Sequence, residues 1–99
     1  MTGYIIAEVD VTDPETYETY RAQTPGVIAR YGGRFIIRGG AAELLEGDDP
    51  PARLVVIEFP DVAAARCFYD SPEYQKIIGI RHRAARSRLI LVEGGAPAA

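Results

Sequence analysis

The chain has few of the residue types that build common functional sites: its 99 residues include one cysteine, one histidine and no tryptophan. A single cysteine, Cys67, excludes an internal disulfide and a cysteine-based metal cluster, and its alanine-rich surroundings predict a small buried thiol. A single histidine, His82, cannot supply a multi-histidine metal site. We therefore expect neither a metal nor a cofactor.

Long apolar runs are also missing. The longest, at residues 54–57 and 89–92, have the length of strands and are far too short to span a bilayer. The N-terminus leads into a strand without the basic and apolar segments of a signal peptide. We expect a cytoplasmic protein without a membrane partner.

Basic residues are in the minority, with 11 against 14 acidic ones and a net charge of −3. This balance disfavours broad nucleic-acid binding. The basic stretch at residues 81–88 contains no aromatic side chain that would stack on bases. Phosphate-loop, nucleophile-elbow and dinucleotide-binding patterns are absent as well. We expect no nucleic-acid partner.

Apolar patterns predict four strands within one domain that spans residues 1–99. They lie at residues 4–11, 34–38, 53–59 and 87–93. The paired glycines Gly39 and Gly40 should bend or bulge the second strand before it continues through residues 41–45. Residues 94–99 should form a loose tail.

Capping signals predict the helices between these strands. Either Asp13 or Thr12 starts the first, Asp61 starts the second and Ser71 starts a third. Pro25 should kink or split the first helix. In that helix apolar residues recur every three or four positions, which predicts one face packed on a sheet: Tyr17, Tyr20, Thr24, Val27, Ile28 and Tyr31.

The resulting order is the ferredoxin-like βαββαβ arrangement, an α+β fold with a four-stranded antiparallel sheet and helices on one face. The strands, however, are apolar on both faces: in the third, Leu54 and Val56 oppose Val55, Ile57 and Phe59. Something must cover the second face. An identical subunit is the economical answer, because twofold dimers are the commonest oligomers.

Short motifs along nearly the whole chain together resemble a known family. They are Val11-Thr12-Asp13-Pro14-Glu15, Tyr31-Gly32-Gly33-Arg34, Arg38-Gly39-Gly40, Ile57-Glu58-Phe59-Pro60 and Tyr69-Asp70-Ser71-Pro72-Glu73-Tyr74-Gln75. In order and spacing they are similar to the domain-of-unknown-function 1330 family, within the dimeric α/β-barrel superfamily. The resemblance implies a homodimer that pairs sheet to sheet into a barrel. It implies no settled activity.

Arg38 and Glu58 are charged residues inside otherwise apolar strands. If the second and third strands pair antiparallel, the two side chains could share a face and lie close. One interpretation is a structural ion pair that fixes the register of the strands. The other is catalytic: Arg38 would hold an anionic ligand oxygen and Glu58 would act as a general base. A register slip of one residue would separate them.

Tyr20, Tyr69 and Tyr74 come from different helices and could converge above the sheet as a polar-tipped aromatic pocket. The alternative is that they are core residues with satisfied hydroxyl groups. The break at Asp70-Ser71 would turn the helix so that Tyr69 and Tyr74 face the same pocket. Arg81 could reach that pocket, and His82 is a further ligand-binding candidate that also suits an exposed helix end.

Two functions follow from these candidates. The first is a cofactor-independent enzyme that abstracts a proton from a small carboxylate or aromatic-type acid, with isomerase-like or monooxygenase-like chemistry. The second is a non-catalytic binding or regulatory module for an unidentified small molecule, with Arg38 and Glu58 as a structural ion pair.

Overall fold

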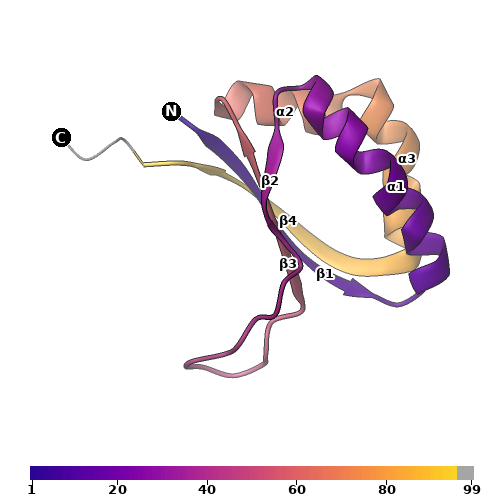
Figure 1. Ribbon diagram of the computed structural model, residues 1–99, viewed down its shortest axis with the longest axis vertical. Coiled ribbons are helices and arrows are strands. Elements are labelled where there is room, and N and C mark those ends of the chain that lie inside the picture. The colour runs from indigo at the N-terminus through magenta and orange to yellow at the C-terminus, as the bar shows by residue number, and fades with distance from the viewer. Residues whose placement is uncertain (96–99) are drawn as a thin grey trace.

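A computed structural model of the chain describes residues 1–95 (Figure 1). Its elements follow in the order β1 (Gly3–Val11), α1 (Pro14–Arg30), β2 (Arg34–Arg38), β3 (Arg53–Phe59), α2 (Val62–Asp70), α3 (Pro72–Ala84) and β4 (Ala85–Glu93). Strands and helices therefore occur in the predicted order. Most of the predicted tail, residues 96–99, lies outside the described residues.

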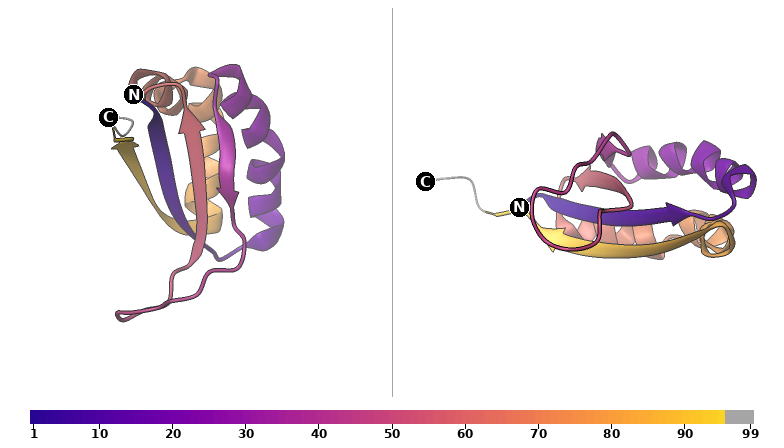
Figure 2. Two further views of the ribbon diagram at one scale, coloured as in Figure 1. Left: turned by 60° about the vertical axis from the view of Figure 1, so that its left-hand side comes forward. Right: turned by 90° about the horizontal axis from the view of Figure 1, so that it is seen from below.

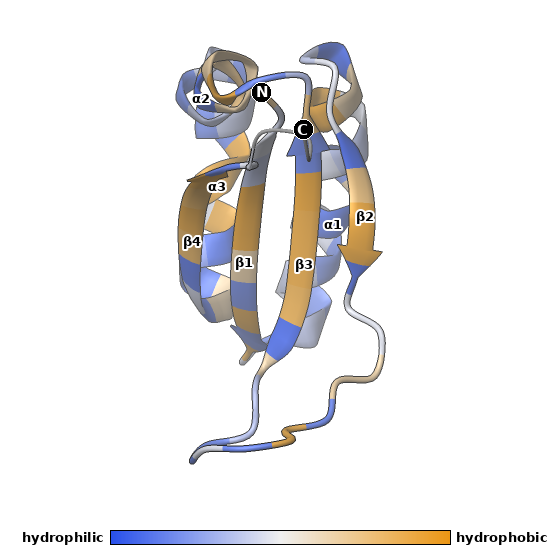
Figure 3. Cartoon of the chain, turned by 90° about the vertical axis from the view of Figure 1, so that its left-hand side faces the viewer, coloured by the Kyte–Doolittle hydropathy of each residue, from blue (hydrophilic) through white to orange (hydrophobic). Residues whose placement is uncertain are grey.

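The four strands form one antiparallel sheet in the order β2-β3-β1-β4. All three helices cover the same face, as two views of the molecule show (Figure 2). The predicted α+β, ferredoxin-like arrangement is confirmed. β2 and β4 form the two edges of the sheet, and the second face is uncovered in the subunit (Figure 3).

Short polar side chains start each helix. The backbone N–H of Thr16 donates to Asp13 Oδ1 at 3.2 Å, and that of Ala64 donates to Asp61 Oδ1 at 2.7 Å. Asp13, rather than Thr12, therefore caps α1, with Pro14 in the first turn. α1 runs unsplit through Pro25 as one helix.

Ser71 separates α2 from α3 because its hydroxyl serves both. It donates to the carbonyl of Phe68 at 2.7 Å and accepts from the N–H of Tyr74 at 3.1 Å. Pro72 follows at the first position of α3, where its missing N–H costs nothing. The helical segment thus ends and restarts at one buried residue.

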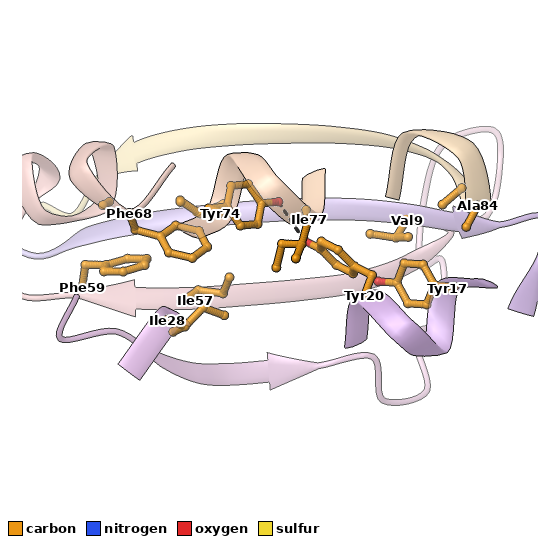
Figure 4. Packing of buried hydrophobic residues seen from close by; sticks show 14 residues of the cluster. Val9, Tyr17, Tyr20, Ile28, Ile57, Phe59, Phe68, Tyr74, Ile77 and Ala84 are labelled. Atoms are coloured by element: carbon orange, nitrogen blue, oxygen red, sulfur yellow. Dashed lines mark hydrogen bonds between the residues drawn. The ribbon is translucent and has the colours of Figure 1, made fainter. Parts of the chain in front are cut away.

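The core lies between the helices and the sheet (Figure 4). Aromatic rings form a continuous line through it: Phe68 contacts Phe59 at 5.4 Å and Tyr74 at 4.5 Å between ring centroids. Ile28 of α1 and Ile57 of β3 are buried beside them. This layer of close-packed rings joins α2 and α3 to the sheet.

Two local predictions are wrong. Residues 41–45 do not continue β2; they belong to a long segment, residues 39–52, that projects from the body (Figure 1). Gly39 has a φ of 73°, a conformation open to glycine that ends the strand. Cys67 is exposed rather than buried, because Ala65 and Phe68 occupy the buried side of α2.

Candidate functional site

A cavity of about 50 Å³ lies between the sheet and the helices α1 and α3. Its floor is apolar and comes from β1, β3 and β4: Ile5, Ala7, Val9, Val55, Ile57 and Leu89. Its walls carry tyrosines and arginines from α1, β2, β3 and α3: Tyr17, Tyr20, Arg21, Arg38, Arg53, Tyr74 and Arg81. No aspartate or glutamate lines it within the described part of the chain.

Two tyrosine hydroxyls meet in the wall of this cavity. The Oη atoms of Tyr20 and Tyr74 are 2.7 Å apart, and both residues are buried (Figure 4). Burial raises the pKa of Tyr20, and the neighbouring Tyr74 raises it further. Tyr20 is therefore a neutral phenol at physiological pH, and one of the two hydroxyls donates its proton to the other.

Arg81 lies beside this tyrosine pair and is only 4% exposed. Its Nη1 donates to Ser87 Oγ on β4, whereas its buried Nε has no hydrogen-bond partner among the described residues. Burial opposes its charge, but the hydroxyls of Tyr74 and Tyr20 hold its pKa above the ordinary value. A charged, incompletely satisfied guanidinium is thus buried at the cavity wall.

Arg53 adds a second buried donor. Its Nε is also enclosed and without a partner in the described chain. Burial raises the pKa of Tyr17, while the positive charges of Arg53 and Arg81 oppose that rise. Tyr17 therefore lies within the electrostatic influence of both guanidinium groups.

Arg38 and Arg21 complete the lining from more exposed positions. The guanidinium carbon of Arg38 lies 4.3 Å from the ring centroid of Phe35, a cation–π geometry that holds the side chain over the aromatic face. Arg21 Nη1 is 3.6 Å from Glu18 Oε2 on the same helix. Both arginines are consequently at the solvent side of the cavity.

The predicted closeness of Arg38 and Glu58 is wrong, because Glu58 pairs with Arg34, four residues before Arg38, and a bulge in β2 also turns Arg38 to the other face. Phe35 pairs with Ile57, but Ile37 pairs with Val56, so Ile36 is an extra residue in β2. Arg38 then pairs with Val55 and faces the helices. Glu58 is on the opposite face of the sheet.

Glu58 pairs instead with Arg34, the first residue of β2. Glu58 Oε1 accepts from Arg34 Nε at 3.0 Å and lies 2.9 Å from Nη2, and the hydroxyl of Tyr4 is 3.5 Å from Oε2. Glu58 therefore has an ion-pair partner on the uncovered face and does not line the cavity.

Tyr69 and His82 do not line the cavity either. Tyr69 is half-buried, and its ring centroid lies 5.7 Å from that of Tyr74, on the side toward β4. There it lines a shallow groove with the exposed His82, the half-buried Ser87 and Leu89, and the buried Arg81. The break at Ser71 thus aims Tyr74 into the cavity but leaves Tyr69 outside.

Of the seven residues predicted from the sequence, four meet around the cavity: Tyr20, Arg38, Tyr74 and Arg81. Sequence patterns did not indicate Arg53, Arg21 and Tyr17 as lining residues. Tyr17 was placed correctly on the buried face of α1, and Arg21 follows one turn later on the same side. Nothing in the sequence around Arg53, apart from its place at the start of β3, indicates that it lines the cavity. No cluster of three potential metal ligands occurs in residues 1–95, and no helix described there is long and apolar enough to cross a membrane.

Residues 2–95 match the family described as Domain of unknown function (DUF1330). Among solved structures, a protein of unknown function from Rhodopseudomonas palustris is 24% identical with a TM-score of 0.76, covering 97% of this chain and 84% of that one. A protein described as dimeric and ferredoxin-like, from Jannaschia sp. CCS1, is 14% identical with a TM-score of 0.70, covering 95% and 100%. SnoaB, a cofactor-independent oxygenase from Streptomyces nogalater, is 19% identical with a TM-score of 0.63, covering 97% and 95%.

One curated relative also matches. The transcription antitermination protein NusB of Granulibacter bethesdensis is 36% identical over 81 residues, which are 80% of this chain. The match spans only 47% of that protein, about half its length. The structural likenesses are all below 25% identity and establish the fold.

Proposed function

This chain belongs to the DUF1330 family, and we propose that it binds a small organic anion in the cavity between its helices and its sheet. The observation that carries the proposal is Arg81, a guanidinium only 4% exposed whose Nε has no partner in the described chain. Buried charges are normally paired, since an unpaired one costs several kcal/mol. A carboxylate in the cavity would supply the missing partner.

The rest of the lining supports the same ligand. Arg53, Arg38 and Arg21 add positive charge, and the described lining contains no carboxylate to neutralise it. The tyrosine pair keeps one hydroxyl proton free to donate, which again suits an acceptor oxygen. The apolar floor favours a hydrocarbon or planar body on the anion.

Binding rather than proton abstraction is the function favoured by this geometry. Glu58, the base of the enzyme hypothesis, lies on the other face of the sheet. Neither a carboxylate nor an imidazole lines the cavity in the described chain, so the usual general bases are not at hand there.

We also propose that the protein is a homodimer that pairs through its uncovered sheet face. That face carries apolar side chains from all four strands, among them Ile37 at 48% and Ile90 at 41% exposed. Ion pairs lie toward its ends: Arg34 with Glu58, and Arg88 with Glu8 at 3.4 Å. An apolar centre with a charged margin suits a twofold, self-complementary interface, and the Jannaschia relative is described as dimeric.

Calorimetric titration with propionate and with its neutral analogue propionamide tests the binding proposal. Propionate should bind and propionamide should not. Arg81→Gln should abolish binding, whereas Arg83→Gln, an exposed arginine two positions later on α3, should not change it. Should Arg81→Gln fail to fold, NMR of the parent protein decides: propionate must shift the ring resonances of Tyr20 and Tyr74. The proposal is contradicted if propionate neither gives a calorimetric signal nor shifts these ring resonances in the parent protein.

A further inference from the structure

The arginines of the cavity lie at two depths. Arg81 is buried at the inner wall. Arg53 has its Nε enclosed beside Gly39, at the end of β2. Arg38, from the edge strand β2, and Arg21, from α1, line the same cavity but are exposed. An anion held by Arg81 would therefore point its other end toward a second positive region.

The size of the cavity limits what the inner region can hold. The cavity volume is about 50 Å³, which is space for a small group such as a carboxylate and an adjoining carbon. Any larger ligand must extend to the mouth of the cavity.

Arg38 supplies a positive charge at that mouth. Arg21 is already 3.6 Å from Glu18, whereas Arg38 has no ion-pair partner among residues 1–95 and rests on the ring of Phe35. The bulge at Ile36 places Arg38 on the cavity side, opposite Val55, which is itself part of the floor. The floor of the same cavity, formed by the sheet, is apolar.

From this arrangement we propose that the ligand is a short dicarboxylate, with one carboxylate at Arg81 and the other at Arg38. The inference rests on the proposed anion binding and adds the chemical class. The inner carboxylate would accept from the unpartnered Arg81 Nε and from the Tyr20 and Tyr74 pair. The hydrocarbon between the carboxylates would cover Val55, and the outer carboxylate would meet the guanidinium fixed over Phe35.

Titrations with two acids of equal carbon number, succinate and butyrate, test this assignment. Succinate should bind about fivefold or more tightly than butyrate, the effect of one partly exposed ion pair with arginine. Arg38→Gln should remove that advantage, because it should weaken the binding of succinate more than the binding of butyrate. Its matched control is Arg34→Gln, which removes the same charge from the same strand but on the opposite face.

The titration results distinguish the dicarboxylate assignment from anion binding itself. Equal affinity for succinate and butyrate in the parent protein overturns the dicarboxylate assignment and leaves anion binding intact. If Arg34→Gln lost the preference for succinate as fully as Arg38→Gln, the preference would be an effect of net charge. That result would also overturn the assignment. Failure of both acids to bind overturns the proposed function itself.

Discussion

The hydroxyl oxygens of Tyr20 and Tyr74 lie 2.7 Å apart in the core, although 54 positions separate the two residues in the chain. The contact joins α1 to α3 directly above the apolar floor of the cavity. It also gives two aromatic residues the hydrogen-bond partner that buried tyrosines require. The same pair therefore serves the fold and the proposed ligand.

We expect Tyr20→Phe to lower the free energy of unfolding by about 1–2 kcal/mol, because it leaves the buried Tyr74 hydroxyl without this partner. Urea denaturation measures the loss. The double variant Tyr20→Phe and Tyr74→Phe should cost less than the sum of the two single variants. Tyr69→Phe is the control, since its ring also contacts Tyr74 but its hydroxyl is not part of the pair. If the loss in the double variant equalled the sum of the two single losses, the two hydroxyls would not be coupled.

Glu58→Gln should leave propionate binding unchanged. Glu58 contacts Arg34 and Tyr4 on the uncovered face of the sheet, away from the cavity. The change should cost less than about 1 kcal/mol of stability, as expected for a partly exposed ion pair. Calorimetry and urea denaturation measure the two quantities. A clear fall in the affinity for propionate would mean that Glu58 does contribute to the binding site.

Ile90→Asp should convert the proposed dimer into a folded monomer. Ile90 is 41% exposed in the subunit, so the aspartate is tolerated there, but it would bury an unpaired charge in the interface. Analytical ultracentrifugation measures the mass, and circular dichroism checks the fold. Leu45→Asp is the control, because Leu45 is 87% exposed on the projecting segment. Parent and Ile90→Asp samples of equal mass would exclude this face as the interface.

The hydrogen bond from the Tyr31 hydroxyl to Glu73 Oε2, at 2.6 Å, should make stability depend on pH at both ends of the range. It lowers the pKa of Glu73 from 4.5, so its stabilising effect is present above that value and is lost as the pH falls through the lowered pKa. It raises the pKa of Tyr31 from 10.0, so the effect is present below that value and is lost as the pH rises through the raised pKa.

The measurement is the difference in unfolding free energy between the parent and Tyr31→Phe. This difference should be largest between roughly pH 5 and 9 and should shrink toward both extremes. A constant difference across the range would mean that the hydroxyl of Tyr31 acts independently of the charge on Glu73.

The sequence predicted the fold well because its local signals agree with one another. Asp13, Asp61 and Ser71 each start a helix where their capping side chains indicated. Alternating apolar residues placed Val55 and Ile57 together on one face of the sheet, and both line the cavity on the covered face. Short-range patterns of this kind depend only on neighbours along the chain.

The site was predicted only in part because its geometry depends on contacts between strands. Alternation along β2 assumes that every residue is paired, and under that assumption Arg38 shares a face with Glu58. The unpaired Ile36 places Arg38 on the opposite face from Glu58. No glycine at this position indicates a bulge in the sequence. Arg53 was missed for a similar reason: only the folded arrangement brings the start of β3 beside α1 and α3.

The bulge in β2 also bears on how relatives of this protein are to be compared. Ile36 has no partner in β3, so a chain without this extra residue would still place its equivalent of Arg38 opposite Val55. An ungapped alignment of such a chain would match Arg38 with a residue one position too far along and assign the wrong side chain to the cavity. A single-residue gap at Ile36 keeps the cationic position in correspondence.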